Sequence, residues 1–98
     1  VDLMKAARAP SKAELTSVGR ALQKHGSRQG SVFPKATGNA ASMNAQGESV
    51  LQNIINHPNA STVTRHHGRF GDIMEIKIPN GQGARFSADG KTFFGFIE

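Results

Sequence analysis

The chain has 98 residues, with twelve Lys and Arg against seven Asp and Glu, so its formal net charge is +5 with four neutral His. This length corresponds to one small domain, and a hydrophobic share of 37% supports a single modest core. The lack of Cys excludes disulfides, thiolate zinc sites and cysteine nucleophiles, and no apolar run approaches the length of a membrane span. The basic balance favours anionic partners, with nucleic acid first and an acidic protein inhibitor second.

The positive charge is concentrated in the first half of the chain. Residues 1–49 hold seven cationic and three anionic side chains, a net charge of +4, whereas residues 50–98 hold five and four, a net charge of +1. A polyanion is therefore expected to meet the N-terminal half first. The chain begins with Val1 rather than Met and carries no secretory signal pattern, so we expect a piece of a longer protein. Residues 1–10 are expected to be a linker arm, and residues 11–98 a single domain.

The first predicted helix covers residues 12–25. Ser11 to Glu14 match a capping box, with Ser at the N-cap and Glu three residues later. An apolar stripe at helical spacing follows, formed by Leu15, Val18 and Leu22. Gly26 is expected to end this helix in a left-handed cap.

A second helix is predicted over residues 42–56, where the apolar residues fall on one stripe. Gly47 weakens this prediction, because glycine costs about 1 kcal/mol relative to alanine inside a helix. The helix is expected to end at Asn56, since His57 precedes Pro58 and the residue before proline avoids helical geometry. Residues 26–39, between the two helices, are expected to form a long functional or mobile loop.

From residue 61 onward, the apolar period changes from that of a helix to that of a strand. Strands are predicted over residues 62–67, 74–78, 84–87 and 92–97. Two of the connections, Asn80-Gly81 and Asp89-Gly90, are strong hairpin signals. We therefore expect an α+β fold, with two N-terminal helices packed on a four-stranded antiparallel sheet whose sequence neighbours are adjacent.

One face of this sheet must meet the helices, and the other is expected to be open to solvent. Alternation predicts an inward set of Met74, Ile76, Ile78, Ala84 and Phe86. An inward Val63 would send His66 to the open face. That face would then carry His66, Glu75, Lys77, Arg85 and Ser87. The last strand has Phe at both parities, and the choice between them stays open.

Such a face has the groups needed to cleave RNA without a metal or other cofactor. A base takes the 2′-hydroxyl proton, an acid protonates the leaving 5′-oxygen, and cations stabilise the phosphorane, leaving a 2′,3′-cyclic phosphate. Histidine suits either proton-transfer role, and Arg binds two phosphate oxygens at once. The candidate catalytic residues are His25, Arg28, His66 and Arg85. The candidate RNA-binding residues are Lys24, Ser31, Lys35, Arg65, His67 and Thr92.

Each candidate string also has a purely structural interpretation. Lys24 and His25 would complement the dipole at a helix C-terminus. The string from residue 65 to 69 would be a solvated edge strand that discourages aggregation. Arg85 would pair with Glu75 across the ladder, a pair that could also position the arginine. A metal site made from the two adjacent His and Asp72 is a weaker interpretation, because strand alternation separates the two imidazoles.

Several strings, taken together, resemble a known family. They are Lys24 to Pro34, Gly38-Asn39, Asn44 to Gly47, Gly83 to Gly90, and Phe94 to Glu98. This combination resembles the C-terminal toxin domains of bacterial contact-dependent growth inhibition proteins of the CdiA type, and of related Rhs and hemagglutinin-like proteins. The resemblance covers most of residues 20–98. His25, Arg28 and Arg85 lie within its strings, whereas the His66-His67 pair does not.

The resemblance implies a ribonuclease with tRNA as its substrate and a fold of the barnase/EndoU/colicin/RelE type. It implies a cognate immunity protein, expected to be an acidic inhibitor. Some members also require elongation factor Tu, which presents the tRNA, and that factor is a candidate partner by resemblance alone. The family further implies export at the end of a larger surface protein and action in the cytoplasm of a target bacterium.

Two other functions remain open from the residues alone. The first is a non-catalytic basic module that binds RNA or a translation factor and blocks it sterically. The second is a metal-dependent DNase toxin that uses the His66-His67 string.

Overall fold

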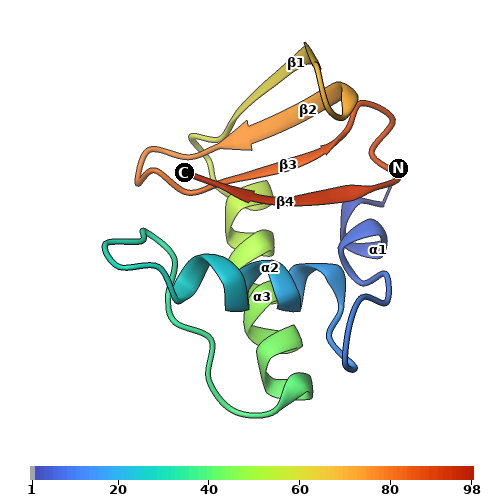
Figure 1. The fold of residues 1–98 in the computed structure, drawn as a ribbon. Helices are drawn as coiled ribbons and strands as arrows, with labels where there is room; N and C mark the ends of the chain where they lie inside the picture. The colour runs from blue at the N-terminus through green and yellow to red at the C-terminus, as the bar shows by residue number, and fades with distance from the viewer. Residues whose placement is uncertain (1) are drawn as a thin grey trace.

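The structure, a computed structural model, describes residues 2–98 (Figure 1). These residues form three helices, α1 (Leu3–Ala7), α2 (Ser17–Gly26) and α3 (Ala40–Asn56), then strands β1 (Ser61–His67), β2 (Gly71–Lys77), β3 (Gly83–Ser87) and β4 (Phe93–Ile97). The strands form one antiparallel sheet in the order β1-β2-β3-β4. The helices lie together on one side of the sheet. The predicted α+β class and strand order are therefore confirmed.

The first ten residues are packed onto the rest of the chain. Helix α1 begins at the N-cap Asp2, whose side chain accepts a hydrogen bond from the backbone N–H of Lys5 at 3.1 Å. Ala6 and Ala7 are buried in the main core. Residues 3–7 therefore belong to the packed domain rather than to the linker that we expected over residues 1–10. Val1 lies outside the described residues.

Helix α2 begins later than predicted. Its N-cap is Thr16, whose hydroxyl accepts a hydrogen bond from the backbone N–H of Gly19 at 3.1 Å. Ala13 and Glu14 have φ angles of 53° and 67°, which are left-handed and incompatible with a helix. The predicted capping box is therefore wrong, because residues 10–16 form a loop closed by an isolated bridge between Pro10 and Thr16.

Gly26 ends α2 for a different reason from the one predicted. The C-cap is Ser27, with a φ of −83°, and Gly26 is not left-handed. A Cβ on Gly26 would instead clash with the backbone of Pro34 and Lys35. Glycine is therefore required here by the close approach of the loop between α2 and α3.

The second predicted helix is confirmed as α3, which begins at Ala40, two residues earlier than predicted, after the N-cap Asn39. It crosses α2 at close range, because a Cβ on Gly47 would lie 2.7 Å from the carbonyl oxygen of Val18. Nearby, the Asn44 side chain accepts a hydrogen bond from the backbone N–H of Thr16 at 2.9 Å and donates one to the carbonyl of Glu14 at 3.1 Å. Helix α3 thus fixes where α2 begins and how closely the two helices approach.

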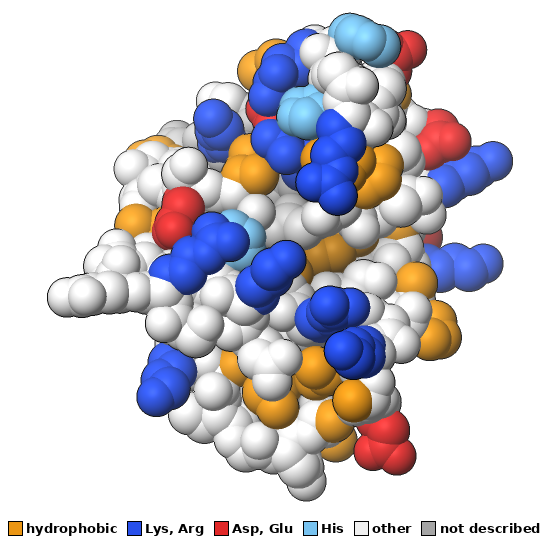
Figure 2. Space-filling model, in the orientation of Figure 1, with side chains coloured by type: hydrophobic (Ala, Val, Ile, Leu, Met, Phe, Trp, Pro, Cys, Tyr) orange, Lys and Arg blue, Asp and Glu red, His pale blue; other side chains and the backbone are white. Residues whose placement is uncertain are grey.

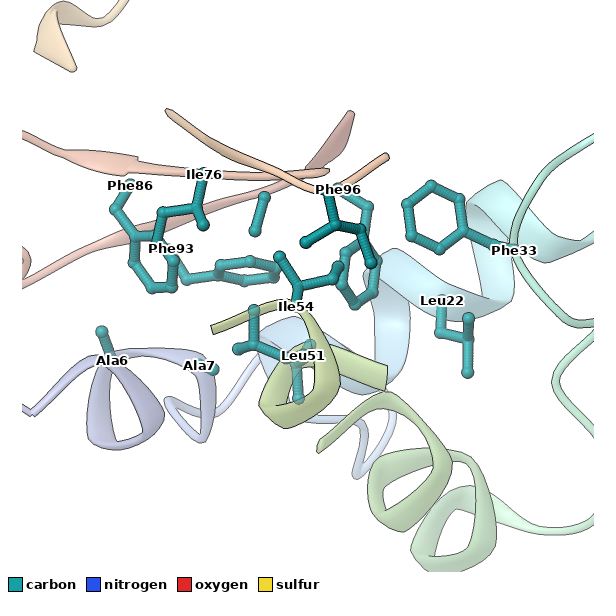
Figure 3. Close-up of a cluster of buried hydrophobic side chains, with 13 residues drawn as sticks. Ala6, Ala7, Leu22, Phe33, Leu51, Ile54, Ile76, Phe86, Phe93 and Phe96 are labelled. Atoms are coloured by element: carbon teal, nitrogen blue, oxygen red, sulfur yellow. The ribbon is translucent and has the colours of Figure 1, made fainter. Parts of the chain in front are cut away.

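The main core lies between the sheet and the helices (Figure 3). Its fully buried members come from every layer: Ala7, Val18, Leu22, Leu51, Ile54, Ala84 and Phe86. The predicted inward set on β2, β3 and the turn after β2 is confirmed. Ile76, Ile78, Ala84 and Phe86 are buried in this core, and Met74 packs against it.

Strand β4 contains a bulge that explains why its parity could not be read from alternation. The register shifts opposite Arg85 and Phe86, so that Phe93 pairs with Phe86, whereas Phe96 pairs with Ala84. Phe93 and Phe96 therefore both point into the core, with 7% and 3% exposure. Gly95, at a φ of 137°, absorbs the extra residue. Phe94 is left outside the core, on the surface of the sheet.

We predict that Gly47→Ala destabilises the protein, although alanine is the better helix former. The new methyl would press on the α2 backbone, which cannot rotate away, and overpacking of this kind costs about 1–3 kcal/mol. Chemical denaturation measures the change in free energy of unfolding. Gly68→Ala is the matched control, because a Cβ there meets nothing within 4 Å and the change should be nearly neutral. A stabilised Gly47→Ala variant would contradict the close α2–α3 crossing.

Candidate functional site: a basic cleft beside the sheet

The register of β1 reverses the predicted parity of its side chains. Val63 pairs with Glu75 and is 55% exposed on the open face, the side of the sheet away from the helices. His66 pairs with Asp72 and so lies on the other face, with its Nδ1 3.2 Å from an Asp72 carboxylate oxygen and 74% of its side chain exposed. The expectation that His66 joins Glu75 and Arg85 is therefore wrong. Among the elements of residues 2–98, strand β1 contacts only β2, so burial does not select which of its faces points inward.

Three side chains on the open face form a charged cluster, which we call the sheet cluster: Arg65, Glu75 and Arg85. The Glu75 carboxylate accepts hydrogen bonds from Arg65 at 3.1 and 3.2 Å and from Arg85 Nε at 2.9 Å, with Arg85 Nη2 at 2.8 Å. Only 7% of the Glu75 side chain is exposed. Burial alone would raise the pKa of Glu75, but the two guanidinium groups outweigh burial and lower it. Glu75 therefore stays ionised and holds both arginines, as expected for the Arg85–Glu75 pair.

A second feature is a cleft of about 270 Å³ between α2 and β4, which we call the α2–β4 cleft. Its walls are Ser11, Ser17, Arg20, Ala21, Lys24, His25, Arg28 and residues 93–96. Arg20 and Lys24 are four residues apart and so lie along one side of α2, and Arg28 follows in the turn just after the C-cap Ser27. The cleft thus combines three cations, one imidazole and the outer surface of β4.

His25 lies in this cleft, partly buried against Phe33 and Phe96 at ring-centroid distances of 5.5 and 6.4 Å. Arg28 Nη1 lies 3.4 Å from His25 Nδ1, a contact in which a neutral imidazole accepts from the guanidinium. Burial lowers the pKa of His25, and the charges of Arg28 and Lys24 lower it further, against the opposite effect of Glu98. His25 is therefore neutral at pH 7 and able to accept a proton.

Phe94 connects the two features. It lines the α2–β4 cleft, and its ring stacks on Phe70 from the β1–β2 turn, with centroids 4.5 Å apart. The guanidinium carbon of Arg85 lies 5.7 Å from the centre of the same Phe70 ring. Figure 2 shows Lys and Arg side chains over α2 and over the β1–β2 end of the sheet on one face of the molecule. The two clusters therefore form one basic surface.

The other predicted binding residues, Ser31, Lys35, His67 and Thr92, lie elsewhere on the molecule. Ser31 donates to Glu98 at 3.2 Å and helps to hold the loop between α2 and α3. His67 Nδ1 accepts hydrogen bonds from the backbone N–H groups of Arg69 and Phe70 and so shapes the β1–β2 turn. Lys35 is exposed in the loop, and Thr92 is exposed in the β3–β4 turn. None of these four residues lines the α2–β4 cleft.

Residues 2–98 contain no group of three His, Asp or Glu side chains arranged to hold a metal ion. His66 and His67 lie on opposite faces of β1, so the proposed set of His66, His67 and Asp72 does not assemble. No helix in the same part of the chain has the length and apolar character needed to cross a membrane.

Comparison with known proteins identifies the family. Residues 4–98 match the CdiA C-terminal tRNase toxin domain. The chain belongs to this family. The fold is similar to that of a solved structure, the toxic C-terminal tip of CdiA from Pseudomonas aeruginosa in complex with immune protein, with a TM-score of 0.81 and 30% identity over 96% of this chain and 99% of that one. A search of curated proteins finds no match.

Membership in the CdiA tRNase toxin family agrees with the resemblance noted from the sequence, but the matching strings have mixed roles here. Asn44 and Gly47 serve the crossing of α2 and α3, whereas His25 and Arg28 line the cleft. Sequence reasoning missed Arg20 and Phe94. The spacing of Arg20 from Lys24 could have revealed the first. Gly95, which interrupts a run of Phe, could have revealed the bulge that leaves Phe94 partly exposed.

We predict that Glu75→Gln lowers the free energy of unfolding by about 1–3 kcal/mol at pH 7, because two guanidinium groups lose their anionic acceptor. The folded chain lowers the pKa of Glu75, so its contribution is present above the pKa of an unfolded glutamate and is lost as the pH falls through the lowered value. Denaturation of both proteins across acid and neutral pH should therefore show the difference shrinking in acid.

Asp72→Asn is the matched control, because the His66–Asp72 pair is exposed and its loss should change stability by less than about 0.5 kcal/mol. A Glu75→Gln effect that is absent at pH 7, or unchanged in acid, would contradict the role assigned to the carboxylate.

Proposed function

We propose that this domain is an antibacterial toxin that cleaves tRNA by transesterification, without a metal ion. The observation that carries the proposal is the position of neutral His25 in a cleft with Arg20, Lys24 and Arg28. Family membership supports the substrate, since the family is described as a tRNase toxin domain. The cleft supports the chemistry, since it combines a proton acceptor with cations suited to a phosphodiester.

In this mechanism His25 is the general base. Arg28 moves from His25 Nδ1 onto the scissile phosphate, and Nδ1, the nitrogen with the lone pair, then takes the proton of the RNA 2′-hydroxyl. The lowered pKa of His25 keeps the imidazole neutral, which suits a base better than an acid. Arg28 and Lys24 bind the scissile phosphate and stabilise the charge that builds on the phosphorane. The new bond from the 2′-oxygen to phosphorus closes the 2′,3′-cyclic phosphate as the bond to the 5′-oxygen breaks, and solvent water protonates the leaving 5′-oxygen. Arg20 lies about one helical turn before Lys24 on α2 and would contact the RNA backbone next to the scissile phosphate.

Arg85 contributes to the same surface from the sheet. Glu75 engages Nε and Nη2 of Arg85, which fixes the plane of the guanidinium, and the Arg85 side chain remains 22% exposed. We assign Arg85 to a phosphate of the bound strand on the far side of Phe94 from the cleft. His66 receives no catalytic role in this proposal, because it lies on the opposite face of the sheet.

One partner, an immunity protein, follows from this assignment. The related Pseudomonas aeruginosa toxin tip was solved with its immune protein, and we propose an acidic immunity protein that covers the basic surface of this chain. Elongation factor Tu stays a candidate partner on the sequence resemblance alone. Delivery from a larger surface protein and action in the target cytoplasm are part of the same proposal.

We predict that His25→Ala lowers the rate of tRNA cleavage by about 10²–10⁴-fold, the usual contribution of a general base. In the intact domain kcat/KM should rise with pH through a value below the pKa of an ordinary histidine, because only neutral His25 accepts the proton. Initial rates on total tRNA across pH measure both effects. His57→Ala, at the half-buried C-cap of α3 and outside the cleft lining, is the matched control and should cleave normally.

Loss of cleavage should be accompanied by loss of growth inhibition when His25→Ala is expressed in a bacterium. If the variant folds and still inhibits growth, the nuclease proposal is wrong and the domain acts as a non-catalytic module that binds RNA and blocks it sterically. If kcat/KM falls as pH rises through the same range, His25 is an acid rather than the base.

We predict that cleavage persists in excess chelator and requires the 2′-hydroxyl at the cut site. A tRNA with a single 2′-deoxy nucleotide at the mapped cleavage position should remain intact, because the attacking nucleophile is missing. The products should carry 2′,3′-cyclic phosphate ends, which end-labelling detects. Cleavage that returns only when a divalent metal is added, or equal cleavage of DNA, would refute this mechanism.

A further inference from the structure

The six Phe of the chain divide into two groups. Phe33, Phe86, Phe93 and Phe96 are buried in the main core, at 7% exposure or less. Phe70 and Phe94 remain partly exposed, and they stack on each other with an interplanar angle of 22°. Two aromatic rings left at the surface of a basic protein, in contact with each other, require an explanation beyond the main core.

The surroundings of this pair are those of a nucleic-acid surface. His67 adds a third ring, 4.9 Å from Phe70, and the guanidinium carbons of Arg69 and Arg85 lie 5.3 and 5.7 Å from the Phe70 ring centre. Phe94 also lines the cleft that holds His25. The rings therefore lie between the cations of α2 and those of the sheet.

We propose that Phe94 and Phe70 form a stacking platform for an unpaired nucleobase of the RNA next to the scissile phosphate. Bases splayed out of single-stranded loops stack on aromatic side chains, while flanking cations hold the backbone. In a duplex the bases stay stacked on one another, so no base is free to stack on the two rings. The domain therefore selects a loop or an unpaired end. This inference rests on the proposed function in taking RNA as the ligand and the α2–β4 cleft as the place of cleavage.

A structural role for the two rings makes a different prediction. Ile73 lies on the open face by its register and is fully buried there, although it is not part of the main core. If Phe70 and Phe94 only cover that face, leucine should replace either ring with little effect on RNA binding. If the rings stack on a base, leucine should preserve the fold and lose the ligand.

The test uses a short single-stranded 2′-O-methyl RNA that carries 2-aminopurine, whose fluorescence is quenched on stacking. The blocked 2′-oxygen prevents cleavage, so binding is measured independently of catalysis. The intact domain should quench the probe in the single strand and not in the matching duplex. Phe94→Leu and Phe70→Leu should abolish quenching and weaken binding by roughly 5- to 100-fold, whereas Phe94→Tyr should retain both.

Val63→Ala is the matched control, because Val63 is an exposed apolar residue on the same face outside the ring pair. Thermal unfolding checks that each variant is folded. Full quenching and affinity in folded Phe94→Leu, or absent quenching in the intact domain, would overturn the platform. Cleavage of unmodified tRNA is scored separately. Cleavage without quenching refutes the platform alone, and quenching without cleavage refutes the nuclease alone.

Discussion

The bulge in β4 determines how the core and the functional surface share one short strand. Phe93 and Phe96 are three residues apart, yet both point into the core, because the bulge opposite Arg85 takes up an extra residue. In a regular strand, residues three apart lie on opposite faces, so one of these rings would leave the core. The same irregularity leaves Phe94 between the α2–β4 cleft and the sheet cluster. Gly95 permits the bulge, because glycine adopts its positive φ of 137° without the steric cost that a side chain would add.

The position of the α2 wall of the α2–β4 cleft depends in turn on α3. Gly47 lets the two helix backbones approach, and Asn44 holds the loop that leads into α2 through hydrogen bonds to Thr16 and Glu14. At the other end of α2, Gly26 lets the following loop approach closely, and Glu98 binds that loop through Ser31 and the backbone N–H of Val32. Helix α2 is therefore fixed at both ends beside β4, which is what gives His25 and the cations a rigid cleft wall.

The parts of the fold that could be predicted are those where burial or turn chemistry leaves one choice. Asn80-Gly81 and Asp89-Gly90 marked two hairpins, and Ile76 and Phe86 alternate because one face of β2 and β3 meets the helices. Strand β1 has no buried face, so its parity could not be read from Val63, and His66 was assigned to the wrong side. His25 and Arg28 were identified as candidates, but their meeting with Phe94 depends on tertiary packing of α2 against β4.

The charges of the basic surface are not equivalent, and the difference bears on catalysis. Arg65 and Arg85 share a buried carboxylate, so part of their charge is neutralised and their main contribution is geometry. Burial lowers the pKa of His25 most, and the charges of Arg28 and Lys24 lower it further, so these two cations act on the imidazole itself. A bound phosphate would offset that charge and raise the pKa of His25 towards its ordinary value. The imidazole would then be a stronger base with RNA in the cleft than without it, so binding of the substrate itself would prepare the proton acceptor for the transfer.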